Sequence, residues 1–139
     1  MSSGIVHGIM VTHGDLGAEF LRTAESILGP QSDMTICSSS GKSYQTLLDS
    51  VSQIVTEKSD QNIPVVLFVD LATGGCGRAC VPIASRFPEA ILICGTNLAM
   101  LIEFLYHRNR VDLDELHQRI IDKGKAEVFS RGRHEDCSK

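Results

Sequence analysis

Residues 6–16 read Val-His-Gly-Ile-Met-Val-Thr-His-Gly-Asp-Leu, and this stretch decides the fold. An apolar run with β-branched residues ends at Thr12, and a helical pattern of apolar residues begins at Leu16. This change of period predicts a strand that passes into a helix through a tight turn. His13 lies in that turn, at the carboxyl edge of the predicted sheet. Because ligands bind at that edge and helix amino termini attract phosphate, we predict that His13 accepts a phosphoryl group.

Strand and helix patterns alternate along the rest of the chain. Further strands are predicted at residues 34–37, 64–70 and 90–94, and helices at 16–28, 47–55, 78–87, 98–106 and 113–121. This alternation predicts a three-layer α/β fold, with a mainly parallel four-stranded sheet and helices on both faces. Right-handed crossovers bring every strand-to-helix turn to one edge of such a sheet. We therefore expect His13, Asp70 and residues 95–97 to share that edge.

Several local features refine these predicted elements. Asp15 is a plausible cap for the first helix, and Asp112 with Glu115 resembles a capping box for the last. Pro82 is compatible with a helix from about residue 78 only if it lies in the first turn. Residues 128–129 could add an edge strand near the end of the chain.

Composition indicates an ordinary globular protein. We expect a single domain over residues 1–139, with a core at about 5–128 and a polar tail. The net charge of −4 argues against nucleic acid as a partner. The sequence lacks an apolar run of the ~18–20 residues that a membrane span needs, and residues 1–4 do not resemble a signal peptide. We therefore expect a cytoplasmic protein without membrane insertion.

The predicted edge suits transfer of a phosphoryl group to histidine. A neutral imidazole can attack phosphorus with one ring nitrogen while a carboxylate holds the other, and Asp70 is the best-placed carboxylate for His13. Backbone N–H groups could hold the phosphoryl oxygens. The candidate phosphate-binding residues are Gly14, Asp15, Leu16, Thr73, Gly74 and Gly75.

Simpler interpretations of the same residues stay open. An aspartate at a strand end is often only a helix cap, and a lone histidine is often only a hydrogen-bonded polar residue. Cys76 and Cys80, near His13, could indicate a metal site or a redox-sensitive site. Zinc usually needs four ligands at recognisable spacings, and the sequence offers no second pair of cysteines. We therefore expect reduced thiols packed in a turn, with no metal and no cofactor.

Three ordered motifs resemble one protein family. Residues 8–16, followed by Ala-Glu-Ser-Ile-Leu-Gly-Pro at 24–30, look like the start of the enzyme IIA component of the mannose/fructose/sorbose-type phosphotransferase system. Val-Asp-Leu at 69–71 and Gly-Thr-Asn-Leu-Ala-Met-Leu at 95–101 resemble its second and third motifs. Residues 122–125 are similar to its final helix, so the resemblance spans residues 5–128.

The resemblance implies a function and a mode of assembly. It implies a phosphotransferase in which His13 takes phosphate from the phosphocarrier HPr and passes it to a IIB component during sugar uptake. Asp70 is then the carboxylate that supports the ring from its other nitrogen. The resemblance also implies a homodimer that exchanges a C-terminal strand, and a peripheral association with a permease.

The loop after Asp70 departs from the family pattern. The family usually has an aromatic residue and a G-G-[ST]-P turn, whereas residues 72–78 read Ala-Thr-Gly-Gly-Cys-Gly-Arg. Ala99 also replaces the usual proline of the third motif. Two alternatives therefore stay open: a regulatory relative that is phosphorylated without serving sugar transport, and a non-catalytic α/β domain that binds a small ligand or a metal.

Overall fold

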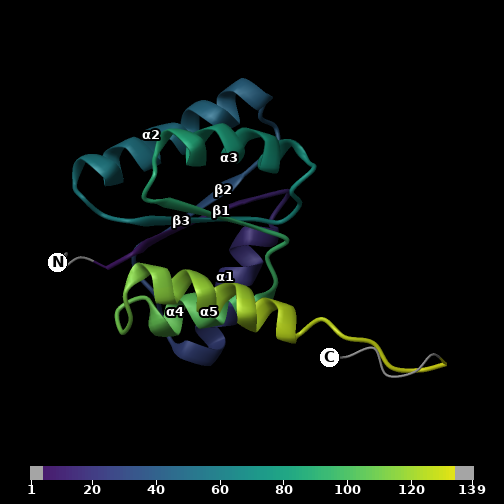
Figure 1. Cartoon of the computed structure of the whole chain (residues 1–139). Helices are drawn as coiled ribbons and strands as arrows, with labels where there is room; N and C mark the ends of the chain where they lie inside the picture. Colours follow the sequence, from purple (N-terminus) through teal and green to yellow (C-terminus); the bar gives the residue numbers. More distant parts are fainter. Residues whose placement is uncertain (1–4, 134–139) are drawn as a thin grey trace.

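The computed structural model describes residues 5–133, which form a four-stranded sheet and five helices (Figure 1). The predicted alternation of strands and helices is confirmed along the whole described chain. In chain order the elements are β1 His7–Thr12, α1 Leu16–Leu28, β2 Met34–Ser38, α2 Tyr44–Asp60, β3 Val65–Val69, α3 Gly75–Arg86, β4 Ala90–Cys94, α4 Leu98–His107 and α5 Leu113–Ala126.

All strands of the sheet are parallel, in the order β2-β1-β3-β4. β1 and β3 are therefore central, and every residue in both strands is buried. Parallel strands covered on both faces are expected to be continuously apolar, as the run at 65–69 is. Val11 pairs with Val69, so the chain leaves β1 and β3 at the same edge and places the residues that follow them side by side.

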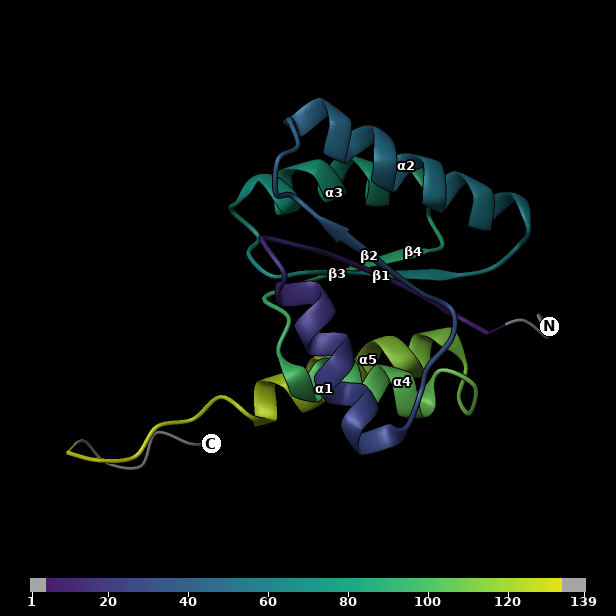
Figure 2. The same cartoon turned by 180° about the vertical axis from the view of Figure 1, so that it is seen from behind.

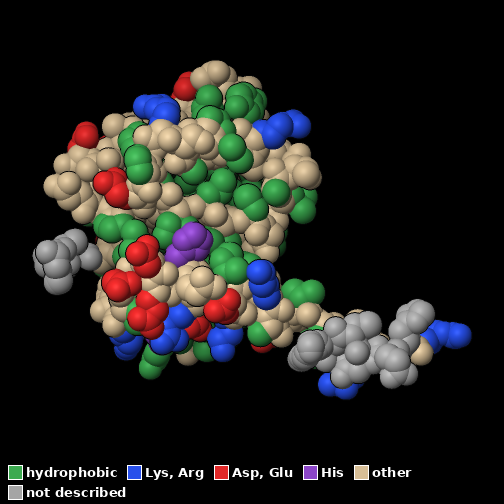
Figure 3. Space-filling view, in the orientation of Figure 1, with side chains coloured by type: hydrophobic (Ala, Val, Ile, Leu, Met, Phe, Trp, Pro, Cys, Tyr) green, Lys and Arg blue, Asp and Glu red, His purple; other side chains and the backbone are tan. Residues whose placement is uncertain are grey.

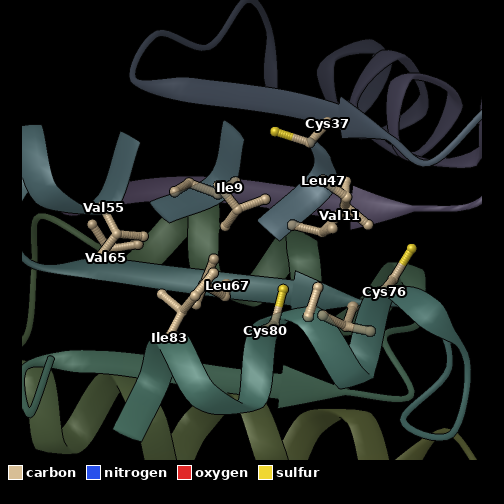
Figure 4. Close-up of a cluster of buried hydrophobic side chains, with 13 residues drawn as sticks. Ile9, Val11, Cys37, Leu47, Val55, Val65, Leu67, Cys76, Cys80 and Ile83 are labelled. Carbon is tan, nitrogen blue, oxygen red and sulfur yellow. The ribbon is translucent and has the colours of Figure 1, made fainter. Parts of the chain in front are cut away.

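Helices cover both faces of the sheet, as predicted. α2 and α3 lie on one face, and α1, α4 and α5 lie on the other (Figures 1 and 2). The core under α2 and α3 is built from aliphatic and cysteine side chains, including Ile9, Leu67 and Ile83 (Figure 4). The core on the other face contains Phe68 and Phe104, whose rings meet edge to face with centroids 5.1 Å apart.

Charged side chains gather over the layer of α4 and α5 (Figure 3). Arg119 contacts Glu115 at 2.9 Å and Glu103 at 3.6 Å, and His107 contacts Glu103 at 3.2 Å. Such partly exposed pairs contribute little to stability. No helix within residues 5–133 is both long enough and apolar enough to cross a bilayer.

α3 begins earlier than predicted, at Gly75, so Pro82 lies in the helix interior rather than in its first turn. The earlier start allows Cys76, Ala79, Cys80 and Ile83 to form one buried stripe against the sheet. Proline cannot donate to the carbonyl four residues before it, which is that of Arg78. The Tyr44 hydroxyl donates to this carbonyl at 3.3 Å, so a side chain from α2 replaces the missing backbone donor.

One local prediction was wrong, and the edge strand at residues 128–129 does not form within the described part of the single chain. Asp15 makes no side-chain cap for α1; instead the Thr12 hydroxyl accepts the N–H of Gly17 at 2.8 Å, because Thr12 is fully buried at the end of β1 and faces the helix. Val128 and Phe129 form no edge strand in the described chain and continue α5 away from the sheet (Figures 1 and 2). Pairing of this segment with a second copy of the chain stays a prediction. The predicted cap of α5 is confirmed: the Asp112 carboxylate accepts the Glu115 N–H at 2.9 Å.

His7 begins β1 at the edge opposite His13 and is only 5% exposed. Its Nε2 lies 2.7 Å from Thr35 Oγ1, and its Nδ1 is buried without a partner among the described residues. A second proton on the ring would therefore have no acceptor. Burial, helped by the positive charge of Lys58, lowers the pKa of His7 to about 4.

We expect acid to destabilise the fold through His7. The unfolded ring takes up a proton near pH 6.5 and the folded ring near pH 4. Between these values the unfolded chain binds more protons, so stability is complete above pH 6.5 and falls as the pH drops. The free energy of unfolding should fall by about 2 kcal/mol between about pH 8 and pH 5, measured by urea titration.

The matched variants for this prediction are His7→Gln and His117→Gln. His7→Gln removes the titrating ring and should flatten the dependence on pH. His117 is exposed on α5, so His117→Gln should keep the dependence of the wild type. If the free energy of unfolding fell equally with pH in the wild type and in His7→Gln, the loss of stability in acid would not be due to His7.

Candidate functional site

His13 and Asp70 meet at the carboxyl edge of the sheet, as predicted. His13 directly follows β1 and Asp70 directly follows β3. One carboxylate oxygen, Asp70 Oδ2, accepts the His13 backbone N–H at 2.9 Å and lies 2.9 Å from the ring Nδ1. The two contacts fix both the position and the orientation of the imidazole.

Asp70 is held as a carboxylate. Its side chain is 9% exposed, and its second oxygen accepts the Leu71 N–H at 2.8 Å. Burial by itself raises the pKa of Asp70, but the hydrogen bonds from the His13 backbone, the His13 ring and Leu71 outweigh it and bring the pKa below its ordinary value. An ionised Asp70 can only accept hydrogen bonds, so it favours the ring tautomer with the proton on Nδ1.

The opposite edge of the His13 ring faces the start of α3. The side chain of His13 is 50% exposed, so the ring is accessible to solvent. A Cβ added to Gly74 would lie 3.0 Å from the ring Cε1 and 3.4 Å from Nε2, so a larger residue there would press against the ring. The site therefore combines a nucleophilic nitrogen with the amino terminus of a helix.

The first turn of α3 supplies backbone donors. Within residues 5–133 the N–H groups of Gly75, Cys76 and Gly77 donate to no protein acceptor. Such unpaired groups, aligned with the helix dipole, are suited to bind an anion. Gly77 lets this turn form, because a Cβ there would come within 2.1 Å of the Ala72 carbonyl oxygen.

The other predicted phosphate-binding residues lie in the turn after β1 and in the loop before α3. Gly14, Asp15 and Leu16 form the turn after His13, and the Leu16 N–H donates to the His13 carbonyl at 3.3 Å. The Gly74 N–H donates to the Leu71 carbonyl at 3.4 Å, and Thr73 is exposed on the loop before α3. Their role toward phosphate stays a prediction.

Cys76, which the sequence analysis placed near His13, contacts the imidazole itself. Its Sγ is 3.9 Å from His13 Nδ1, and the residue is fully buried. Burial raises the pKa of the thiol, and the Asp70 charge raises it further, although a hydrogen bond with Ser39 acts in the opposite direction. The early start of α3 brings Cys76 and Gly77 to the site. The only sequence signal for this start is the Gly-Gly pair at 74–75.

A family model and a curated relative match most of the chain. The sequence model of the PTS system fructose IIA component family matches residues 8–121. The PTS system sorbose-specific EIIA component of Klebsiella pneumoniae is 23% identical over 116 residues, which are 84% of this chain and 84% of that protein.

Solved structures share the fold. The phosphotransferase system component EIIA from Streptococcus agalactiae superimposes with a TM-score of 0.80 at 20% identity, covering 91% of this chain and 97% of that one. The mannose/sorbose specific IIA subunit from Enterococcus faecalis superimposes with a TM-score of 0.77 at 23% identity, covering 95% and 98%. At such identities these two structures establish the fold alone, whereas the family match covers most of the chain.

Proposed function

The chain belongs to the PTS system fructose IIA component (EIIA-man) family, and from this premise we propose that it is a phosphohistidine carrier. In this proposal His13 takes a phosphoryl group from an HPr-type phosphocarrier and passes it to a IIB component during carbohydrate uptake. The observation that carries the proposal is the contact of His13 Nδ1 with Asp70 Oδ2 at 2.9 Å.

That contact explains how the ring becomes a nucleophile. With its proton on Nδ1, the neutral ring keeps a lone pair on Nε2, the nitrogen nearer Gly74. Nε2 attacks phosphorus, a new nitrogen–phosphorus bond forms, and the bond between phosphorus and the donor breaks. The ring becomes positively charged as the bond forms, and the Asp70 carboxylate stabilises that charge. Transfer to the next carrier reverses these steps.

The surroundings of Nε2 support the same proposal. The N–H groups of residues 75–77 lie at the start of α3, where they can stabilise the charge on the phosphoryl oxygens. Leu16 ends the turn after His13 and is 43% exposed. Leu71 directly follows Asp70 and is 58% exposed. Exposed apolar side chains beside a reactive group are suited to contact a protein partner.

The described tail supports the proposed homodimer. Val128 and Phe129 are 75% and 54% exposed. They line an open groove of about 740 Å³ together with Asn97, Leu98, Ala99, Ile102 and Glu127. Apolar residues that leave the body in an extended segment are suited to pair with a second copy of the chain, which is the exchange that the family resemblance implies.

A regulatory carrier is the second candidate, because the loop after Asp70 is altered. Leu71, Ala72 and Thr73 are all exposed there, and the loop contains no aromatic residue. A partner that docks on an aromatic side chain at this point would lose that contact. The regulatory alternative shares the phosphorylation of His13 and differs in having no onward transfer to IIB.

We expect the full chain to acquire phosphate from an HPr-type protein that carries radioactive phosphate on histidine. The label should be acid-labile and should map by peptide mass spectrometry to the peptide that contains His13. His13→Ala serves as the blank, and His117→Ala, on the exposed face of α5, should be labelled like the wild type. A chain without label, or label on another residue, would contradict the proposal. Adding a IIB component then separates the two candidates, because only the transport carrier gives up its label.

A further inference from the structure

We propose that His13, Asp70 and Cys76 bind one thiophilic divalent metal ion, such as zinc, and that this ion blocks phosphoryl acceptance by His13. Each residue offers one ligand atom, and these atoms lie within 4.8 Å of one another. They come from three separate elements: the end of β1, the end of β3 and the first turn of α3. The proposed metal site does not depend on the proposed carrier function. The proposed block of phosphorylation does rest on that function.

The distances are close to those of a tetrahedral site. Nδ1 of His13 lies 2.9 Å from Asp70 Oδ2 and 3.9 Å from Cys76 Sγ. Zinc bonds of ~2.0–2.3 Å at tetrahedral angles separate ligand atoms by about 3.3–3.7 Å. The carboxylate and the ring therefore need to move apart by a few tenths of an ångström, and the sulfur needs to approach the ring by a similar amount. The sulfur and the carboxylate lie within 4.8 Å of each other, so they need to come closer by up to about 1 Å. Asp70 and Cys76 are buried, so a water that completes the coordination has to reach the ion past the half-exposed side chain of His13.

The donor set determines which ions fit. A thiolate, an imidazole and a carboxylate together favour zinc, cobalt or cadmium, whereas magnesium and calcium prefer sites made only of oxygen. The buried Asp70 carboxylate supplies negative charge beside the ligands, and the Cys76 thiolate formed on binding adds more. The N–H groups at the start of α3 oppose a cation, so the thiolate has to provide much of the affinity.

Binding has a defined proton balance. The Cys76 thiol loses its proton to solvent when the sulfur–metal bond forms. The proton of the neutral His13 ring moves from Nδ1 to Nε2, and the Nδ1 lone pair binds the ion. Each ion bound therefore releases one proton.

The same rearrangement makes metal binding and phosphorylation mutually exclusive. Phosphoryl acceptance needs a lone pair on Nε2 and a proton on Nδ1, whereas the metal-bound ring has the reverse arrangement. The ion also occupies the Asp70 oxygen that would stabilise the charged ring. A chain loaded with metal is therefore a poor phosphoryl acceptor until the ion is removed.

Cys80 provides a matched control. It lies one turn after Cys76 on α3, is also fully buried, and is not part of the ligand group. Burial raises the pKa of its thiol to about 12. A response that needs Cys76 and not Cys80 therefore reports this site rather than cysteine in general.

The test is a titration of the reduced full chain with Co²⁺ in the absence of chelators. We expect one Co²⁺ ion per chain and a thiolate-to-cobalt charge-transfer absorption band. Added zinc should displace the cobalt and abolish the band. Cys76→Ser should lose the band and bind zinc at least about 100-fold more weakly, while Cys80→Ser should retain both. Absence of the band, or its persistence in Cys76→Ser, would overturn the proposal.

A second measurement needs no variant at the site. Zinc added to the wild type in weak buffer should release one proton per ion and shift the His13 Nδ1 nitrogen resonance as in metal coordination. A shift at Nε2 instead, or no shift, would also overturn the proposal. Labelling by the phosphorylated HPr-type donor should stop at saturating zinc and return with a chelator. Labelling without zinc tests the carrier function separately, so failure of one proposal is distinguishable from failure of the other.

Discussion

Asp70→Asn is expected to slow phosphoryl acceptance on His13 by about 10³-fold while the fold is retained. In the wild type, one oxygen of Asp70 accepts both the backbone N–H and the ring N–H of His13, and the other accepts the Leu71 N–H. An asparagine has a single oxygen and an NH₂ group, so it cannot accept at both positions. If the NH₂ group of the asparagine faces the ring, His13 Nδ1 has to accept a hydrogen bond from it. The single N–H proton of the neutral ring then lies on Nε2. The nitrogen that should attack phosphorus is then protonated.

The measurement is the rate of labelling by an excess of phosphorylated HPr-type donor, followed by rapid quench. Asp60→Asn is the matched control, because it makes the same change of charge at an exposed position at the end of α2. Circular dichroism and the denaturation midpoint establish that both variants are folded. If Asp70→Asn accepted phosphate as fast as Asp60→Asn, Asp70 would not have the role assigned to it.

Most of the fold could be predicted from the sequence because strong local patterns agree with the topology. The apolar run at 65–69 is too short for a helix and too continuous for an exposed strand, so it indicates a central strand. The start of α3 was mispredicted because Gly75 and Gly77 are weak helix formers and Pro82 suggested a first turn. Burial of the stripe from Cys76 to Ile83 outweighs these local preferences.

The candidate site was predictable to the extent that it depends on strand ends. Parallel pairing of β1 with β3 is enough to place His13 beside Asp70. The sequence placed Cys76 near His13, but its contact with the ring could not be predicted, because that contact depends on where α3 begins. The sequence suggested Cys76 and Cys80 near His13 as possible metal ligands, although no metal was expected, whereas the group in the structure has Asp70 in place of Cys80. No spacing rule links residues from three different elements.

Arg108 was also not predicted, although a signal for it exists. It follows α4 and continues the buried stripe of Leu101 and Phe104 at helical spacing, where an arginine is unusual. The residue is 4% exposed, and its guanidinium lies 5.4 Å from the centre of the Phe104 ring. The charge is thus buried near the edge of the sheet opposite His13.

Arg108→Met is expected to lower the free energy of unfolding by about 3 kcal/mol. The guanidinium joins the segment before β1 to the loop before β2, where Asp33 has a positive φ of 58°. Methionine retains much of the packing volume but donates no hydrogen bond, so the buried Val6 carbonyl and three partly buried oxygens lose the guanidinium as a donor. The acceptors and their distances are Val6 O at 3.1 Å, Asp33 O at 3.0 Å, Ser32 O at 2.6 Å and Gln31 Oε1 at 3.2 Å.

Urea denaturation at neutral pH measures this loss, and two further variants define its cause. Arg110→Met removes an exposed arginine two residues away and should change stability by less than about 0.5 kcal/mol. Arg108→Lys retains the charge but lacks the planar group that reaches several acceptors at once, so its stability should lie between wild type and Arg108→Met. Equal stability of Arg108→Met and Arg110→Met would show that these hydrogen bonds do not hold the two segments together. Because Arg108 lies far from His13 along the sheet, a folded Arg108→Met chain should still accept phosphate, which separates stability from chemistry at the site.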